Sequence, residues 1–104
     1  MTVSTFREDG DDKARWTLMG SWYVYIVRCA DDSLYTGITK DVTRRVREHN
    51  ARGLSAARYT RGRQPVELVY RETVESRAAA TRREHEIRRL RRNQKLGLIG
   101  KSER

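Results

Sequence analysis

The stretch WYVYIVRCADDSLYTGITKDVTRRVREH, residues 22–49, decides the fold of this chain. Its first six residues are all β-branched or aromatic, a composition typical of a β-strand. Both faces of this strand are apolar, which indicates that it is covered on both sides and lies centrally in a sheet. A polar ADDS turn separates it from LYTGIT, residues 34–39, so the two segments predict a β-hairpin.

Two tyrosines determine how this hairpin must pair if they are to act together. Side chains alternate along a strand, so Tyr25 and Tyr35 share a face only if paired residue numbers sum to an even value. A loop with an odd number of residues gives that pairing. We therefore expect a three-residue loop from Ala30 to Asp32, with Asp32 in the left-handed conformation.

A short helix should follow the hairpin. Asp41 is a favourable N-cap residue, and Val42 and Val46 would point inward from the helix that it starts. Arg45 and His49 lie four residues apart and therefore share another face of the same helix. These two side chains can act together beside the tyrosines.

The rest of the chain predicts one more strand and one long helix. Pro65 opens a strand over residues 65–73, in which Val66, Leu68 and Tyr70 form one face. A helix over residues 76–92 follows, starting at Glu75 or Ser76, with an inner stripe of Ala80, Ile87 and Leu90. A tail over residues 93–100 should fold Leu96, Leu98 and Ile99 back onto the core. The expected architecture is α+β, a small three-stranded antiparallel sheet flanked by helices in the order β-β-α-β-α.

The length and net charge of the chain limit the number of its domains and the kind of partner that it can bind. A chain of 104 residues supports one domain with a modest core. It carries 23 Lys and Arg against 14 Asp and Glu, a net charge of +9. Most of these cations are arginines, whose planar guanidinium pairs with phosphate, so nucleic acid is the expected partner. The alternative is that the arginines reflect genome composition and general solubility.

The same composition excludes two classes of protein. A single cysteine, Cys29, cannot form an intramolecular disulfide and fits a reducing compartment. The sequence contains no apolar run long enough to span a membrane, and the N-terminal segment lacks a secretory signal. We expect a cytoplasmic protein with no membrane contact. Residues 1–20 read as a flexible extension, with Met19 as an alternative start, and residues 21–104 as the domain.

The segment ARGLSAARYTRGRQP, residues 51–65, has the composition of a mobile loop. Its arginines can neutralise phosphates, and Tyr59 can offer a stacking face to an unpaired base. The expected nucleic-acid contacts are Arg58, Tyr59, Arg61 and Arg63, together with Arg52. The alternative is a solvated loop without a binding role.

The spacing of these residues resembles the GIY-YIG nuclease superfamily. YVY at residues 23–25 stands in place of the first signature, and YTG at residues 35–37 stands in place of the second. Tyr23 replaces the signature's glycine, and Val24 and Thr36 replace its two isoleucines; none of these supplies a reacting atom. The match runs from Ser21 to the end, and the nearest likeness is to small stand-alone bacterial single-domain GIY-YIG proteins. The family's catalytic set corresponds here to Tyr25, Tyr35, Arg45, His49 and Glu84.

The resemblance implies a role for each of these residues. Glu84 would hold one divalent ion, Mg²⁺ or Mn²⁺, since a lone carboxylate suits an ion that keeps most of its waters. Tyr25 would be the general base, with its pKa lowered by Arg45 and by the metal-bound substrate. Tyr35 would orient water or phosphate, Arg45 would contact the scissile phosphate, and His49 would donate to phosphate or assist proton transfer.

Each role has a simpler structural alternative. Glu84 can form an ion pair with Arg88 one turn later, the strand tyrosines can serve packing alone, and His49 can be a surface imidazole. His85 projects away from Glu84 and reads as solvated, whereas Asn93 is a weaker candidate because it stands near where relatives can place an amide.

The chemistry that these residues offer is phosphodiester hydrolysis. We expect a metal-dependent DNA endonuclease, guided by nucleic-acid structure rather than base sequence, of a kind that DNA repair uses. The alternative is a basic DNA- or RNA-binding protein that retains the fold without turnover.

Overall fold

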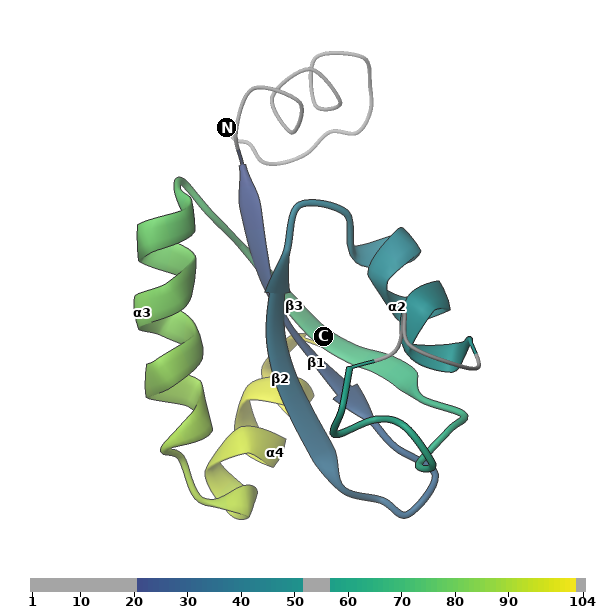
Figure 1. Ribbon diagram of the computed structural model, residues 1–104. Helices are drawn as coiled ribbons and strands as arrows, with labels where there is room; N and C mark the ends of the chain where they lie inside the picture. The colour runs from purple at the N-terminus through teal and green to yellow at the C-terminus, as the bar shows by residue number, and fades with distance from the viewer. Residues whose placement is uncertain (1–20, 52–56, 103–104) are drawn as a thin grey trace.

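The computed structural model describes residues 21–51 and 57–102 (Figure 1). The elements are β1 (Trp22–Arg28), β2 (Leu34–Thr39), α2 (Val42–Asn50), β3 (Glu67–Val74), α3 (Arg77–Arg88) and α4 (Arg92–Ser102). The expected α+β architecture is confirmed, with one helix more than the sequence indicated. The predicted extension over residues 1–20 lies outside the described residues.

The three strands form one antiparallel sheet in the order β2-β1-β3, so β1 is central, as its two apolar faces predict. Tyr25 pairs with Gly37, and Val27 pairs with Tyr35. These sums are even, so the two tyrosines share a face. The backbone N–H of Cys29 donates to Ser33 O at 2.8 Å and closes the expected three-residue loop. Asp32 has a φ of 72°, which confirms its left-handed conformation.

The register of β3 on β1 departs from simple alternation. It shifts in the middle of the strands, where Val69 is an extra residue that forms a β-bulge. Val69 and Tyr70 consequently both pack on one core cluster, whereas Val66 is buried in the other. Leu68 is 36 % exposed. The predicted face of Val66, Leu68 and Tyr70 is therefore wrong, because strict alternation cannot continue through a bulge.

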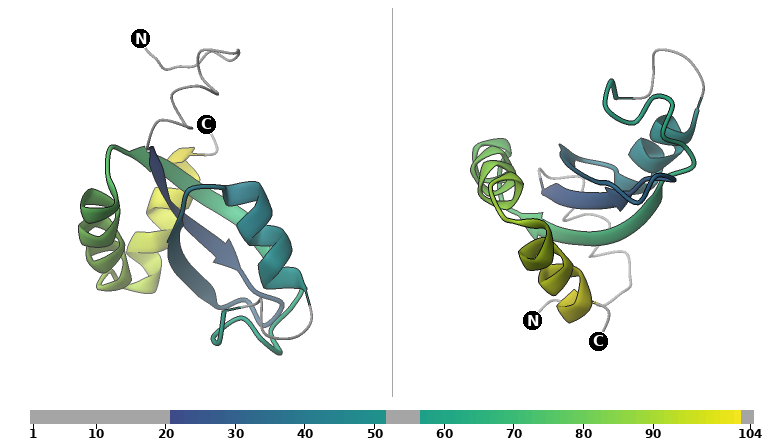
Figure 2. Two further views of the ribbon diagram at one scale, coloured as in Figure 1. Left: turned by 45° about the horizontal axis from the view of Figure 1, so that its top comes forward. Right: turned by 90° about the horizontal axis from the view of Figure 1, so that it is seen from below.

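Each face of the sheet has its own core. One face, covered by α3 and α4, holds the buried cluster Val24, Ile26, Ala80, Ile87 and Ile99. The other face, beside α2, holds Tyr25, Val27, Cys29 and Val66. Figure 2 shows α2 and α4 on opposite sides of the sheet. The side chain of Asp41 accepts from Arg44 N at 3.0 Å and caps α2, as expected, and Ser76 rather than Glu75 caps α3.

The helix predicted over residues 76–92 is present but ends earlier than expected. Helix α3 ends at Arg88, and α4 begins at Arg92, where Gln94 Oε1 accepts from Arg91 N at 2.9 Å. A straight helix from residue 77 to 102 would be about 39 Å long. The eight residues of β3, the longest strand, span only about 26 Å. About a third of such a helix would extend beyond the sheet.

The turn between α3 and α4 returns the C-terminal segment to the sheet. Ile99 joins the core at 3 % exposure, and Leu98 packs against the same cluster, as predicted. Leu96, which was expected to fold back with them, is 37 % exposed. None of the helices in the described part of the chain is long and apolar enough to cross a membrane.

Candidate active site

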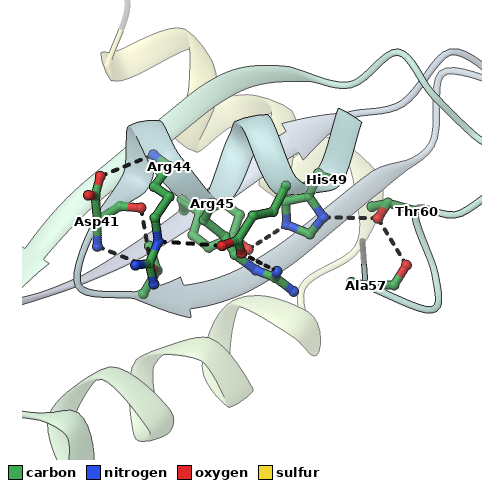
Figure 3. Close-up of polar contacts among 9 residues, drawn as sticks. Asp41, Arg44, Arg45, His49, Ala57 and Thr60 are labelled. Atoms are coloured by element: carbon green, nitrogen blue, oxygen red, sulfur yellow. Dashed lines mark hydrogen bonds and ion pairs between the residues drawn. The ribbon is translucent and has the colours of Figure 1, made fainter. Parts of the chain in front are cut away.

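The centre of the site is His49, on the inner side of α2. Its side chain is fully buried, so the alternative of a surface imidazole is wrong. Its Nε2 atom lies 2.7 Å from the hydroxyl of Tyr25, and its Nδ1 atom lies 2.9 Å from the hydroxyl of Thr60. Figure 3 shows the line of contacts from His49 through Thr60 to Ala57. Both ring nitrogens are therefore engaged.

The contacts of Thr60 assign the tautomer of this histidine. The Thr60 hydroxyl donates its hydrogen to Ala57 O at 3.0 Å, so it accepts a hydrogen from Nδ1 of His49. The neutral ring then has a lone pair on Nε2, and Tyr25 donates to it. The hydrogen bonds run in one direction, from Tyr25 through His49 and Thr60 to the backbone.

The electrostatics reinforce this assignment. Burial lowers the pKa of His49 to about 4, with the charge of Arg45 acting in the same direction, so the imidazole is neutral near pH 7. Burial also raises the pKa of Tyr25, and Tyr35 raises it further. The cation of Arg45 lowers the Tyr25 pKa by less than burial raises it. In the free protein Arg45 alone therefore does not make Tyr25 a phenolate, and Tyr25 is a phenol that donates to His49.

Gly37 makes room for this phenol. A Cβ atom at residue 37 would lie 2.6 Å from the Tyr25 hydroxyl and 2.8 Å from Cζ of its ring, closer than such atoms approach. The tyrosine ring therefore lies across the glycine of the neighbouring strand. The glycine in the YTG motif has a steric role that sequence alone did not assign.

Tyr35 and Arg45 border the buried pair. The ring of Tyr35 meets His49 edge-on at 5.3 Å between centroids and stacks on Tyr59 at 5.6 Å. Arg45 donates to Glu48 at 2.7 Å, and its charge acts on both Tyr25 and His49. The structure thus brings four of the sequence-predicted residues together on one side of the sheet.

Glu84 approaches from α3. Its side chain is 16 % exposed, and Oε2 pairs with Arg88 at 3.1 Å, so the ion pair that was the structural alternative is present. Its negative charge nevertheless raises the pKa of Tyr25, which places Glu84 near the same site. The other carboxylate oxygen has no hydrogen bond or ion pair with the residues that the structure describes.

A divalent ion at this position would have one protein carboxylate. Within residues 21–51 and 57–102, no group of three or more His, Cys, Asp and Glu side chains could hold a metal. Mg²⁺ suits such a position, because it keeps several waters and takes phosphate oxygens as ligands. The available oxygen of Glu84 fits that coordination.

The described part of the segment after α2 is a loop, as expected. Arg63 pairs with Asp31 at 3.0 Å, donates to Tyr59 O at 2.7 Å and lies over the Tyr59 ring at 4.2 Å. Tyr59 and Arg63 therefore make contacts within the protein, and residues 57–63 form turns rather than a helix or strand, as the predicted loop requires. Arg58 and Arg61 are exposed, while Arg52 lies outside the described residues.

Three residues that sequence reasoning missed hold this segment in place. Thr60 is buried and orients His49. Asn50 makes two hydrogen bonds with the backbone of Val66, at 3.1 and 2.6 Å, and Gln64 donates to His49 O at 2.8 Å. The only feature of the sequence that could have indicated these three residues is that they are uncharged polar residues in or beside an arginine-rich segment. His85 is exposed, as predicted, and the weaker candidate Asn93 is exposed as well.

Comparison with known proteins gives consistent matches. The model of the GIY-YIG catalytic domain matches residues 21–96. The UPF0213 protein DP2720 of Desulfotalea psychrophila is 51 % identical over 84 residues, which is 81 % of this chain and 76 % of that protein. The UPF0213 protein HQ_3675A of Haloquadratum walsbyi is 60 % identical over 76 residues, which is 73 % of this chain and 83 % of that protein.

A solved structure is also similar. The solution NMR structure of the UPF0213 protein BH0048 from Bacillus halodurans shares 43 % sequence identity, with a TM-score of 0.49. The match covers 77 % of this chain and 83 % of that one.

Proposed function

This chain belongs to the GIY-YIG catalytic domain family, a family of nucleases, and we propose that it is a metal-dependent DNA endonuclease that hydrolyses phosphodiester bonds. The observation that carries the proposal is the 2.7 Å hydrogen bond from Tyr25 to the buried His49. A phenol that donates to a neutral imidazole is arranged to pass a proton onward. Arg45 supplies the fixed positive charge that a phosphate requires.

In the proposed mechanism Tyr25 and His49 relay one proton. The attacking water gives a proton to the Tyr25 hydroxyl oxygen while the hydroxyl proton moves to Nε2 of His49. The water oxygen forms a bond to phosphorus, and the ester P–O bond breaks with its electron pair on the leaving oxygen. His49 ends as an imidazolium that still donates to Thr60, and Tyr25 ends as a phenol.

Substrate binding would make His49 a better base. In the free protein, Arg45 contributes to the low pKa of this histidine. A phosphate bound at Arg45 brings negative charge that offsets the guanidinium, so the His49 pKa rises when substrate is present. The relay is then strongest when a phosphodiester occupies the site.

Glu84 is the residue that would hold the divalent ion, Mg²⁺ or Mn²⁺. The bound ion would neutralise charge on the phosphate and on the leaving oxygen. Arg88 now pairs with one carboxylate oxygen and leaves the other available. An exposed ion pair of this kind contributes about 0.3 to 0.5 kcal/mol, so it is easily replaced.

The proposed substrate is DNA whose structure, rather than base sequence, directs the cut. In this proposal Arg45, together with the exposed Arg58 and Arg61, would contact the phosphate backbone, which carries no sequence information. Nicked, flapped or single-stranded regions present the accessible backbone that such a site needs. These are structures on which DNA repair acts, and we place this activity in the cytoplasm.

The test is a panel of duplex, nicked, flapped and single-stranded DNA and RNA, incubated with Mg²⁺, Mn²⁺ or EDTA. We expect cleavage of at least one DNA substrate with a divalent ion and none in EDTA. If purified protein cuts no member of the panel with either ion, the endonuclease proposal is wrong.

One observation favours a second function, a DNA- or RNA-binding protein without turnover. Glu84 already has Arg88 as a partner and is the only predicted ligand for the ion. A protein of this kind would bind the same panel equally well in Mg²⁺ and in EDTA and would leave every substrate intact.

A further inference from the structure

The outer side of α3 carries a stripe of three side chains that the proposed mechanism does not use. Arg82, His85 and Arg89 are exposed, and their spacing of three and four residues puts them on one side of the helix. We call them the α3 stripe. Helix α3 stands at the side of the molecule, so this surface faces solvent (Figure 1).

The two arginines of the α3 stripe have no acidic partner among the described residues. Glu86 lies one turn from Arg82 but pairs with Arg83 at 3.0 Å. Arg83 also pairs with Glu72, at 2.7 Å, on β3. The acids in reach of α3 are thus occupied by other cations, and the stripe remains a positive surface without internal neutralisation.

The α3 stripe lies about 100° to 160° around the helix from Glu84. At about 100° per residue, Glu84 lies between the core side of α3, marked by Ile87, and the α3 stripe. Arg88, which pairs with Glu84, lies between Glu84 and the stripe. A nucleic acid that passes Glu84 would therefore reach the stripe only by extending around α3 over Arg88, beyond the cleavage position.

We propose that the α3 stripe binds the sugar–phosphate backbone of the nucleic acid outside the cleavage position. Arg82 and Arg89 lie about 10 Å apart along the helix axis. One strand of duplex DNA rises about 3.4 Å per nucleotide, so the two arginines reach phosphates about three nucleotides apart. The proposal rests on the proposed function for the identity of the ligand, but it concerns binding and not the chemical step.

The experiment compares an Arg82→Gln/Arg89→Gln double variant with wild type in EDTA, where no cleavage occurs. Affinity for a flapped DNA duplex is measured at several salt concentrations, and folding is checked by circular dichroism. A Lys95→Gln/Lys101→Gln double variant, which removes the same charge from α4, is the matched control. We expect the slope of log K against log salt to become less steep by about two for the α3 variant and to change by much less for the control.

The outcomes separate this inference from the proposed function. Equal slopes for the α3 variant and wild type would overturn the α3 stripe even if wild type cuts DNA. An equal loss in the α4 control would also overturn it, because the effect would then reflect net charge alone. A reduced slope in the α3 variant, with the control unchanged, supports the stripe even if no substrate is ever cut.

Discussion

The two halves of the candidate site are built differently. On the α2 side, Tyr25, His49 and Thr60 form a buried chain of neutral hydrogen bonds whose direction is set by the backbone oxygen of Ala57. On the α3 side, Glu84 is partly exposed and holds an ion pair with Arg88. The buried half is fixed before substrate arrives, whereas the exposed half can exchange one cation for another. Proton transfer needs the first property, and reversible binding of a metal and phosphate needs the second.

The largest expected effect comes from removing charge in the exposed half. Glu84→Gln should abolish metal-dependent cleavage and leave DNA affinity in EDTA unchanged or slightly higher, since a negative charge leaves the phosphate path. Gel assays of nicking and a binding titration measure the two effects. Glu86→Gln is the matched control, because Glu86 is also an ion-paired carboxylate on α3. Wild-type cutting by Glu84→Gln would remove this residue from the site.

In the buried half, Tyr25→Phe keeps the ring and deletes the hydroxyl. We expect cleavage to fall by about 10³-fold, the upper range for loss of one proton-transfer or transition-state group. The variant should also lose about 1 to 3 kcal/mol of unfolding free energy, because Nε2 of His49 is left buried without a partner. Urea unfolding checks the second effect. Tyr23→Phe, on the same strand, should cut at a rate close to wild type.

Arg45 acts on the buried half through its charge. Arg45→Ala should slow cleavage by about 10² to 10³-fold and weaken binding only modestly, as expected for a group that acts mainly on the transition state. It should also raise the pKa of His49, because the guanidinium now helps to lower it. NMR titration of the imidazole measures that shift. An unchanged pKa would show that burial alone acts on His49.

Stability should depend on pH through the buried half. His49 has a pKa of about 4 in the fold against 6.5 when exposed, so between these values the unfolded chain binds more protons. The free energy of unfolding should therefore have its highest value above pH 6.5. It should fall by on the order of 3 kcal/mol as the pH drops toward 4. Urea unfolding above about pH 4.5, where most carboxylates stay ionised, measures this slope.

Two variants test the source of that pH dependence. His49→Gln should remove the slope, whereas His85→Gln should retain it because His85 is exposed. A slope that persists in His49→Gln would assign the effect to another group.

The smallest effect should come from the residue that orients the histidine. Thr60→Val removes the acceptor for Nδ1 but keeps the shape of the side chain, and we expect cleavage to fall by about tenfold. Thr60→Ser restores a hydroxyl and should recover most of the rate. Nitrogen NMR shifts of His49 report its tautomer, which should become mixed in Thr60→Val. Equal tautomer populations in both variants would reduce Thr60 to a packing role.

Patterns within residues 22–49 were sufficient to predict the hairpin, its loop and the shared face of Tyr25 and Tyr35. These features depend on strand alternation and loop length, which are local properties. The cap by Asp41 and the spacing of Arg45 and His49 were predicted for the same reason. The sequence alone is thus sufficient to predict which side chains of α2 and the sheet lie at the site.

Tertiary contacts decided the rest. The bulge at Val69 and the end of α3 at Arg88 follow from how β3 and the helices fit a short sheet, which no local pattern encodes. The protonation of Tyr25 depends on its burial, and burial overrode the nearby cation that sequence reasoning had favoured. Thr60 acquired its role only when the segment after α2 packed against His49. Local sequence determined which side chains can reach the site, and packing determined their protonation and partners, because desolvation and hydrogen bonding depend on every segment that surrounds a group.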